Sequence, residues 1–209
     1  MTLNQSFLPV TAAALALVAL AVAGCRVRDH RAPNGENKNV QVDTPFGGLR
    51  VNTDQTSAGD LGLAIYPGAN QIKDDNNNTS ADVRLGLGPW QLRVRTVSYE
   101  SADSEQKVAD FYQKALGRYG DVLTCRDHQP VGELKQTSEG LSCSDSEEKG
   151  AHFEISGQGA THKDSDGLEL KAGSRRHQHI VVFEKSPAGH TRFTLVGLDL
   201  PSSGDTKGD

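Results

Sequence analysis

The stretch DSEQKVADFYQKALGRYG, residues 103–120, decides the fold. Its apolar residues recur at helical spacing, which predicts an amphipathic helix with one buried stripe. The stripe consists of Val108, Phe111, Tyr112, Ala115, Leu116 and Tyr119. Asp103, followed by Gln106 three positions later, predicts the N-terminal cap, and Gly120 predicts the stop. A helix with one apolar stripe needs a sheet to cover.

The residues before this helix supply a hairpin for that sheet. In ADVRLGLGPWQLRVRTVSYE, residues 81–100, two alternating runs are joined by GPW. One face carries Val83, Leu85 and Leu87 in the first run, and Leu92, Val94 and Thr96 in the second. Alternation of period two predicts antiparallel strands. Further upstream, Leu63, Ile65 and Tyr66 predict a short strand that the Pro67-Gly68 turn ends.

The residues after the helix predict a series of short strands separated by Gly, Ser and Asp clusters. They are VLTCR (122–126), GLSCS (140–144), HFEIS (152–156), GLELKAG (167–173), HQHIVVFEK (177–185) and TRFTLVGLDL (191–200). The sequence therefore predicts an α+β domain over residues 60–200, with one amphipathic helix packed on a mostly antiparallel sheet. Residues 201–209 are expected to form a disordered tail.

The segment before this domain, residues 25–59, is rich in Asn, Gly, Asp and Thr. Its apolar residues are too sparse for an amphipathic period, so a flexible linker is predicted. Within it, FGGLRV (46–51) is a candidate edge strand.

The first 24 residues contain no Asp, Glu, Lys or Arg. The uninterrupted apolar run from Ala12 to Ala23 would form a helix of about 18 Å, shorter than the roughly 30 Å of a hydrocarbon core. This length favours a removable export signal over residues 1–24 rather than a membrane-spanning helix.

The signal ends in Val22-Ala23-Gly24-Cys25, a branched residue and then small ones before a cysteine. This resembles the lipobox of bacterial lipoproteins, in which the cysteine sulfur receives a diacylglycerol and the residue becomes the new N-terminus. The resemblance implies lipidation at Cys25, with palmitate among the added chains. An ordinary secretory signal with a chance cysteine and a buried core helix are the alternatives.

Two further cysteines remain, Cys125 and Cys143. In an oxidising compartment a bridge between them would close a loop of about 18 residues and contribute on the order of 3 kcal/mol. Two unpaired thiols in a reducing compartment are the alternative.

Several motifs of residues 60–200 resemble those of uncharacterised exported bacterial lipoproteins. They are the Tyr66-Pro67-Gly68-Ala69 turn, Tyr99 with the acidic cap, the Phe111-Tyr112, Leu116 and Tyr119-Gly120 helix, and the HIVV and GHTRFTLV strands (179–182 and 189–196). The resemblance implies a fold and an exported location, and no reaction.

The chain carries 22 Lys and Arg against 27 Asp and Glu, a formal net charge of -5. That balance argues against a nucleic-acid partner. The sequence has no G-x-S-x-G, H-E-x-x-H, phosphate-loop or dinucleotide signature and no C-x-x-C pair, so it points to no cofactor.

Two groups of residues are candidates for chemistry. Arg84, Arg93 and Arg95 fall on the face of the hairpin opposite its apolar residues and form a candidate site for a carboxylate or phosphate. A solvated sheet face is the alternative. His177 and His179 share one face of a strand, a spacing that zinc or copper sites use. His152, His162 or His190 would be the third ligand; two exposed polar residues are the alternative.

The sequence thus predicts a lipid-anchored cell-envelope protein, most consistent with a non-enzymatic module that binds an envelope protein or a small ligand. A metal-assisted hydrolase using His177 and His179 is the competing hypothesis. Arg26 stands where some enterobacterial lipoproteins carry the aspartate that retains them in the inner membrane. In a host with two membranes, the expected location is therefore the outer membrane, facing the periplasm.

Overall fold

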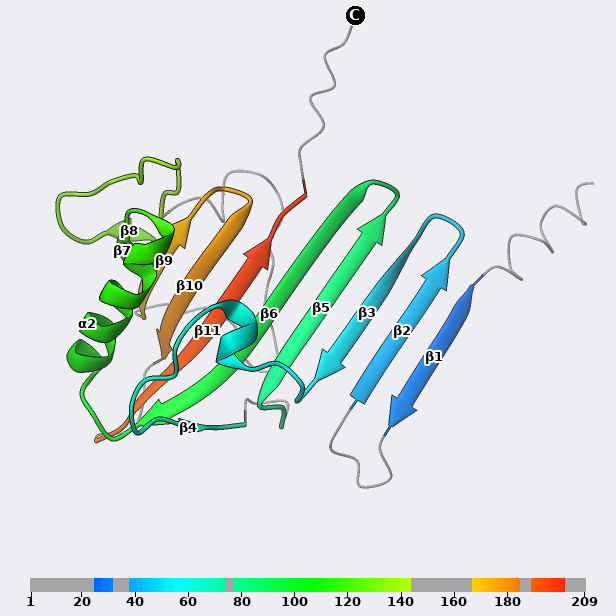
Figure 1. Cartoon of the computed structure of the whole chain (residues 1–209), viewed down its shortest axis with the longest axis horizontal. Helices are drawn as coiled ribbons and strands as arrows, with labels where there is room; N and C mark the ends of the chain where they lie inside the picture. Colours follow the sequence, from blue (N-terminus) through cyan, green and yellow to red (C-terminus); the bar gives the residue numbers. More distant parts are fainter. Residues whose placement is uncertain (1–24, 32–37, 74–76, 144–166, 185–188, 202–209) are drawn as a thin grey trace, which may run out of the picture.

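The computed structural model describes residues 25–31, 38–73, 77–143, 167–184 and 189–201. These residues form an eleven-stranded sheet in which neighbouring strands are antiparallel, with the helix α2 (Glu105–Leu116) on one face (Figure 1). The predicted α+β class, one helix on a mostly antiparallel sheet, is confirmed. No helix among the described residues is long and apolar enough to cross a bilayer.

The sheet runs in the order β1-β2-β3-β5-β6-β11-β10-β9-β7-β8, and β4 pairs with β6 beside this path. The strands are β1 (Arg26–Arg31), β2 (Lys38–Thr44), β3 (Gly47–Thr53), β4 (Asn70–Gln71), β5 (Ser80–Leu87), β6 (Trp90–Ser101), β7 (Leu123–Arg126), β8 (Gln129–Pro130), β9 (Leu168–Gly173), β10 (His177–Glu184) and β11 (Thr191–Asp199). The predicted hairpin is β5 and β6, with Val83 opposite Val94. The predicted closing pair is β10 and β11.

The helix covers the β9–β11 end of the sheet (Figure 1). The predicted apolar stripe of the helix packs in the core. Val108, Tyr112 and Leu116 are fully buried. On the sheet, the centre of the Phe193 ring lies 5.4 Å from that of Tyr112 and 5.8 Å from that of Tyr99. Aromatic side chains dominate the area buried in a core of this size, so this cluster fixes the helix on the sheet.

The ends of the helix differ from the prediction. The N-cap residue is Ser104, and Asp103 does not cap the backbone. Its carboxylate instead accepts from Lys107 Nζ at 2.9 Å and from the Tyr66 hydroxyl at 2.9 Å, so its oxygens are already used. The helix ends at Leu116, and a 3-10 turn, η3 (Gly117–Tyr119), carries the chain on to Gly120 with φ 121°.

The predicted strand over residues 63–66 is absent, since these residues have no strand neighbour among the described ones. The Tyr112 hydroxyl donates to the Ala64 carbonyl and accepts from the Tyr66 N–H, both at 3.2 Å. The Tyr112 side chain thus forms hydrogen bonds with backbone groups that would otherwise pair with a neighbouring strand. The predicted turn forms, with Ala69 N–H bonded to the Tyr66 carbonyl and Gly68 at φ 80°.

The prediction of a flexible linker over residues 25–59 requires correction, because β1, β2 and β3 lie in this segment and extend the sheet. The predicted edge strand is β3, which lies inside the sheet between β2 and β5. Val40 and Val42 alternate with polar residues in β2, and in β3 Val51 faces Val40. Two apolar side chains per strand are too few to suggest a strand by composition, yet they suffice for one that joins an existing sheet edge.

The folded body therefore begins at Arg26 rather than at residue 60. Past β3 the chain continues into a 3-10 turn, η2 (Ala58–Leu61), whose Ala58 and Leu61 are buried in the core.

Cys125 and Cys143 form a disulfide, as predicted. It ties β7 to the loop over residues 131–143. The predicted strand at 140–144 is reduced to a single bridge between Gln136 and Ser142. The export signal (1–24), the predicted strand at 152–156 and the tail from residue 202 lie outside the described residues.

Candidate functional site: an arginine-rich sheet face

The sheet face that carries α2 continues past the helix as a polar surface. Along β6, Val97 and Tyr99 are buried in the helix-covered core. Side chains two positions apart share a face, so Arg93 and Arg95 lie on the same face, farther along the strand. From here on, "the helix face" means this side of the sheet.

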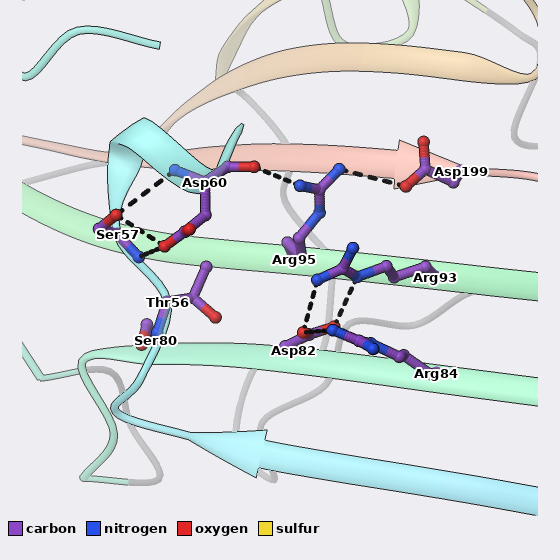
Figure 2. A network of polar contacts seen from close by, with 9 residues as sticks. All are labelled: Thr56, Ser57, Asp60, Ser80, Asp82, Arg84, Arg93, Arg95 and Asp199. Atoms are coloured by element: carbon purple, nitrogen blue, oxygen red, sulfur yellow. Dashed lines mark hydrogen bonds and ion pairs between the residues drawn. The ribbon is translucent and has the colours of Figure 1, made fainter. Parts of the chain in front are cut away.

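Asp82 holds two of the three predicted arginines (Figure 2). Arg93 donates to its two oxygens at 2.9 and 2.8 Å, and Arg84 at 3.3 and 2.8 Å. The Asp82 side chain is only 10% exposed. Burial alone would raise the pKa of this carboxyl, but the hydrogen bonds from Arg93 and Arg84 outweigh it and lower the pKa to about 2. The aspartate therefore stays ionised and fixes both guanidinium groups in orientation.

Arg95 is anchored separately. Its guanidinium lies beside Gly197. It donates to the Asp199 carboxylate at 3.1 Å and to the Asp60 carbonyl of η2. Ser57 and Asp60 cap this turn reciprocally, and the hydrogen bonds from Ser57 lower the pKa of Asp60. Arg95 thereby fastens η2 to the sheet.

A hollow of about 240 Å³ lies beside Asp82 and its two arginines. It is lined by Asn52, Gln55, Thr56, Asp60, Asp82, Arg84 and Arg93. The Thr56 N–H donates to Ser80 Oγ at 3.0 Å, and this hydrogen bond fixes Thr56 at one side of the hollow (Figure 2). The structure thus brings the three predicted arginines together, but it also brings the carboxylates of Asp82 and Asp199 and the carbonyl of Asp60 to them, which the sequence analysis did not anticipate.

Two further arginines of this face were missed by the sequence analysis. In the register of the sheet, Arg50 of β3 lies opposite Arg84 of β5, which lies opposite Arg93 of β6. On the other side, Arg50 faces Gln41 of β2, and Gln41 faces Arg28 of β1. Directly paired residues of antiparallel strands share a face. Arg28, Arg50, Arg84 and Arg93 therefore form a line across the sheet, which we call the arginine row.

The outer part of the row is open. Arg28, Arg50 and Arg84 are exposed, and the Arg84 side chain is 49% accessible although it contacts Asp82. Within the part of the chain that the structure describes, Arg28 and Arg50 have neither an ion pair nor a hydrogen bond from their side chains. The alternating patterns RVR (26–28) and LRV (49–51) are the sequence features that could have indicated strands with outward-facing arginines.

His177 and His179 share one face of β10, as predicted; this is the helix face, and the two residues have different partners. His177 is exposed, with Nδ1 3.0 Å from an oxygen of Asp199. His179 stacks on Tyr119, with ring centres 3.6 Å apart, and burial lowers its pKa.

No group of three or more His, Cys, Asp and Glu residues suited to a metal occurs among the described residues. Of the third ligands considered, His190 lies at the opposite end of β11, 3.5 Å from Glu100. His152 and His162 are outside the described ranges.

Cys25 is exposed and is the free cysteine of the described residues. It directly precedes β1, the strand at one end of the sheet order.

Comparisons with protein-family models, with curated proteins and with solved structures find no match.

Proposed function

We propose that this chain is an exported protein anchored to a bacterial membrane by lipid on Cys25, and that its folded body is a non-enzymatic module that binds anionic groups on its arginine-rich face. In a host with two membranes it would face the periplasm from the outer membrane.

The proposed lipid anchor is supported by the bonding of the three cysteines. Cys125 and Cys143 are joined to each other, and Cys25 is exposed next to the first strand. A partner for Cys25 within the chain is therefore lacking, and the small residues Ala23 and Gly24 before it suit a lipoprotein signal peptidase. The disulfide also fits an oxidising, exported compartment.

The arrangement of the arginines supports anion binding. Arg84 and Arg93 are already oriented by Asp82, so they lose little freedom when an anion arrives. Arg50 stands beside Arg84 in the register with its charge uncompensated. Phosphate and carboxylate groups are the ligands that such guanidinium groups bind best. Nothing specific favours the hydrolase hypothesis, because His179 is packed under Tyr119.

The anchor is tested by expressing the full chain in a bacterium beside Cys25→Ser and measuring membrane fractionation and intact mass. We expect the wild type in the membrane fraction, beginning at residue 25 and heavier by a diacylglycerol and a fatty acyl chain. The variant should carry no lipid. A wild-type protein that is released with no added mass would disprove the anchor.

A further inference from the structure

The start of the folded body lies next to the proposed anchor. Because β1 begins at Arg26, only two residues separate Cys25 from Arg28, the outermost member of the arginine row. At about 3.3 Å per residue this is a distance of about 10 Å. A lipid on Cys25 would therefore hold the β1 edge of the sheet at the membrane surface, without an intervening linker.

The charge of this region is opposite to that of the whole chain. On the helix face of β1, β2, β3 and β5 the arginines Arg26, Arg28, Arg50 and Arg84 stand against the aspartates Asp43 and Asp82. The protein as a whole carries a net charge of -5. Positive charge is thus concentrated on the part of the sheet nearest Cys25.

The geometry of this part suits a flat partner. Neighbouring strands lie about 5 Å apart, so Arg28 and Arg50 are separated by about 10 Å and Arg50 and Arg84 by about 5 Å. No described helix packs over β1, β2 or β3 on this face, as Figure 1 shows. The arginine side chains are long enough to reach outward from the sheet while their stems lie along it.

We infer that the outer arginine row, Arg28, Arg50 and Arg84, docks the sheet onto the anionic lipid headgroups of the membrane in which Cys25 is anchored. The inference rests on the proposed function and names the anion of that same site: the phosphate groups of lipids. An anionic membrane attracts each nearby arginine, and the effect falls off within a Debye length. The anchor supplies one attachment and the row a second, and together they restrict the orientation of the domain.

The test uses residues 25–209 with Cys25→Ser, which contain every described element and carry no lipid. Flotation is measured with vesicles of phosphatidylcholine and with vesicles in which a third of the lipid is phosphatidylglycerol. We expect binding to the second only, and its loss when about 1 M salt shortens the Debye length to about 3 Å. Arg28→Gln with Arg50→Gln should weaken binding roughly twenty-five-fold, about fivefold for each arginine.

Two matched variants sharpen the test. Lys114→Gln removes one positive charge from the exposed surface of α2, as each arginine change does from the row, and should leave binding unchanged. Arg50→Lys keeps the charge and should retain binding, because attraction to a charged surface does not need the planar guanidinium group. Thermal unfolding of each variant checks that the fold persists.

Equal binding to both vesicle types, no binding, or an unchanged affinity of the double variant would overturn the inference. Displacement by inorganic phosphate at constant ionic strength would replace it with a site for a small anion. Retention on immobilised polyglutamate without vesicle binding would replace it with an acidic protein partner. The outcome is separate from the anchor: vesicle binding with no lipid on the wild type would refute the anchor alone, and a lipidated wild type with no vesicle binding would refute the docking alone.

Discussion

The two ends of the sheet use the same backbone ladder and differ in what covers them. At the β9–β11 end, the helix face carries Phe193 and Leu195, which are fully buried in the core that α2 and η2 cover. At the β1–β5 end, the same face carries exposed arginines. Strand pairing therefore does not depend on burial of this face. Each outer strand needs only an existing neighbour and apolar side chains on the opposite face.

The two ends of the sheet have different roles: the covered end stabilises the fold, and the open end presents charges for binding. The covered end holds the aromatic cluster, and the disulfide lies at the same end of the sheet. The open end contributes few fully buried side chains but positions a line of charges. A surface that must meet a partner has to remain uncovered, so the covered end carries most of the stability.

The largest expected effect comes from truncating one side chain at each end. Phe193→Ala should lower the free energy of unfolding by about 3–5 kcal/mol, because the ring is fully buried and contacts three other aromatic rings. Val51→Ala at the open end should cost about 1 kcal/mol, since this side chain is only half-buried. Denaturant unfolding of the two variants measures both values. Equal losses would show that the open end is as strongly packed as the covered end.

Much of the covered end was predictable from the sequence, because its residues follow strong periodic patterns. The helix stripe repeats at period 3.6, and the continuous apolar run around Val181 is bounded by polar and turn residues, which is typical of a buried strand. The disulfide followed from counting cysteines after Cys25 was set aside.

The open end was predictable only in part. The β5 strand alternates and β3 was expected as an edge strand, but in β2 composition outweighs the short alternation of Val40 and Val42, and a polar strand then resembles a linker. The strand predicted at residues 63–66 failed for a different reason, because the Tyr112 hydroxyl, far away in sequence, binds its backbone. The arginine row depends on the register of five strands, which no local pattern encodes.

The second expected effect concerns Asp82, which joins the row to the hollow. Its pKa of about 2 in the folded protein lies below its ordinary value near 3.8. The ionised form is therefore favoured by folding, and this stabilisation is complete above about pH 4 and is lost as the pH falls toward 2. Asp82→Asn should lower the free energy of unfolding at neutral pH by about 1–2 kcal/mol and flatten its acid dependence.

Urea unfolding between pH 2 and pH 7 measures this dependence. Asp110→Asn, an exposed position on α2, is the control and should behave as the wild type does. If Asp82→Asn keeps the full acid dependence, the arginine contacts of Asp82 do not stabilise the fold.

The smallest expected effect lies at the covered end, where His179 stacks on Tyr119. Burial lowers the pKa of His179, so the folded protein favours the neutral ring. As the pH falls below about 6.5, the unfolded chain takes up a proton before the folded protein does, and the free energy of unfolding decreases. His179→Phe retains a stacked ring that cannot titrate, and it should remove this decrease below about pH 6.5. Tyr119→Ala uncovers the histidine and should reduce the decrease without abolishing it. An unchanged pH dependence in both variants would mean that the ring is as easily protonated in the fold as in the unfolded chain.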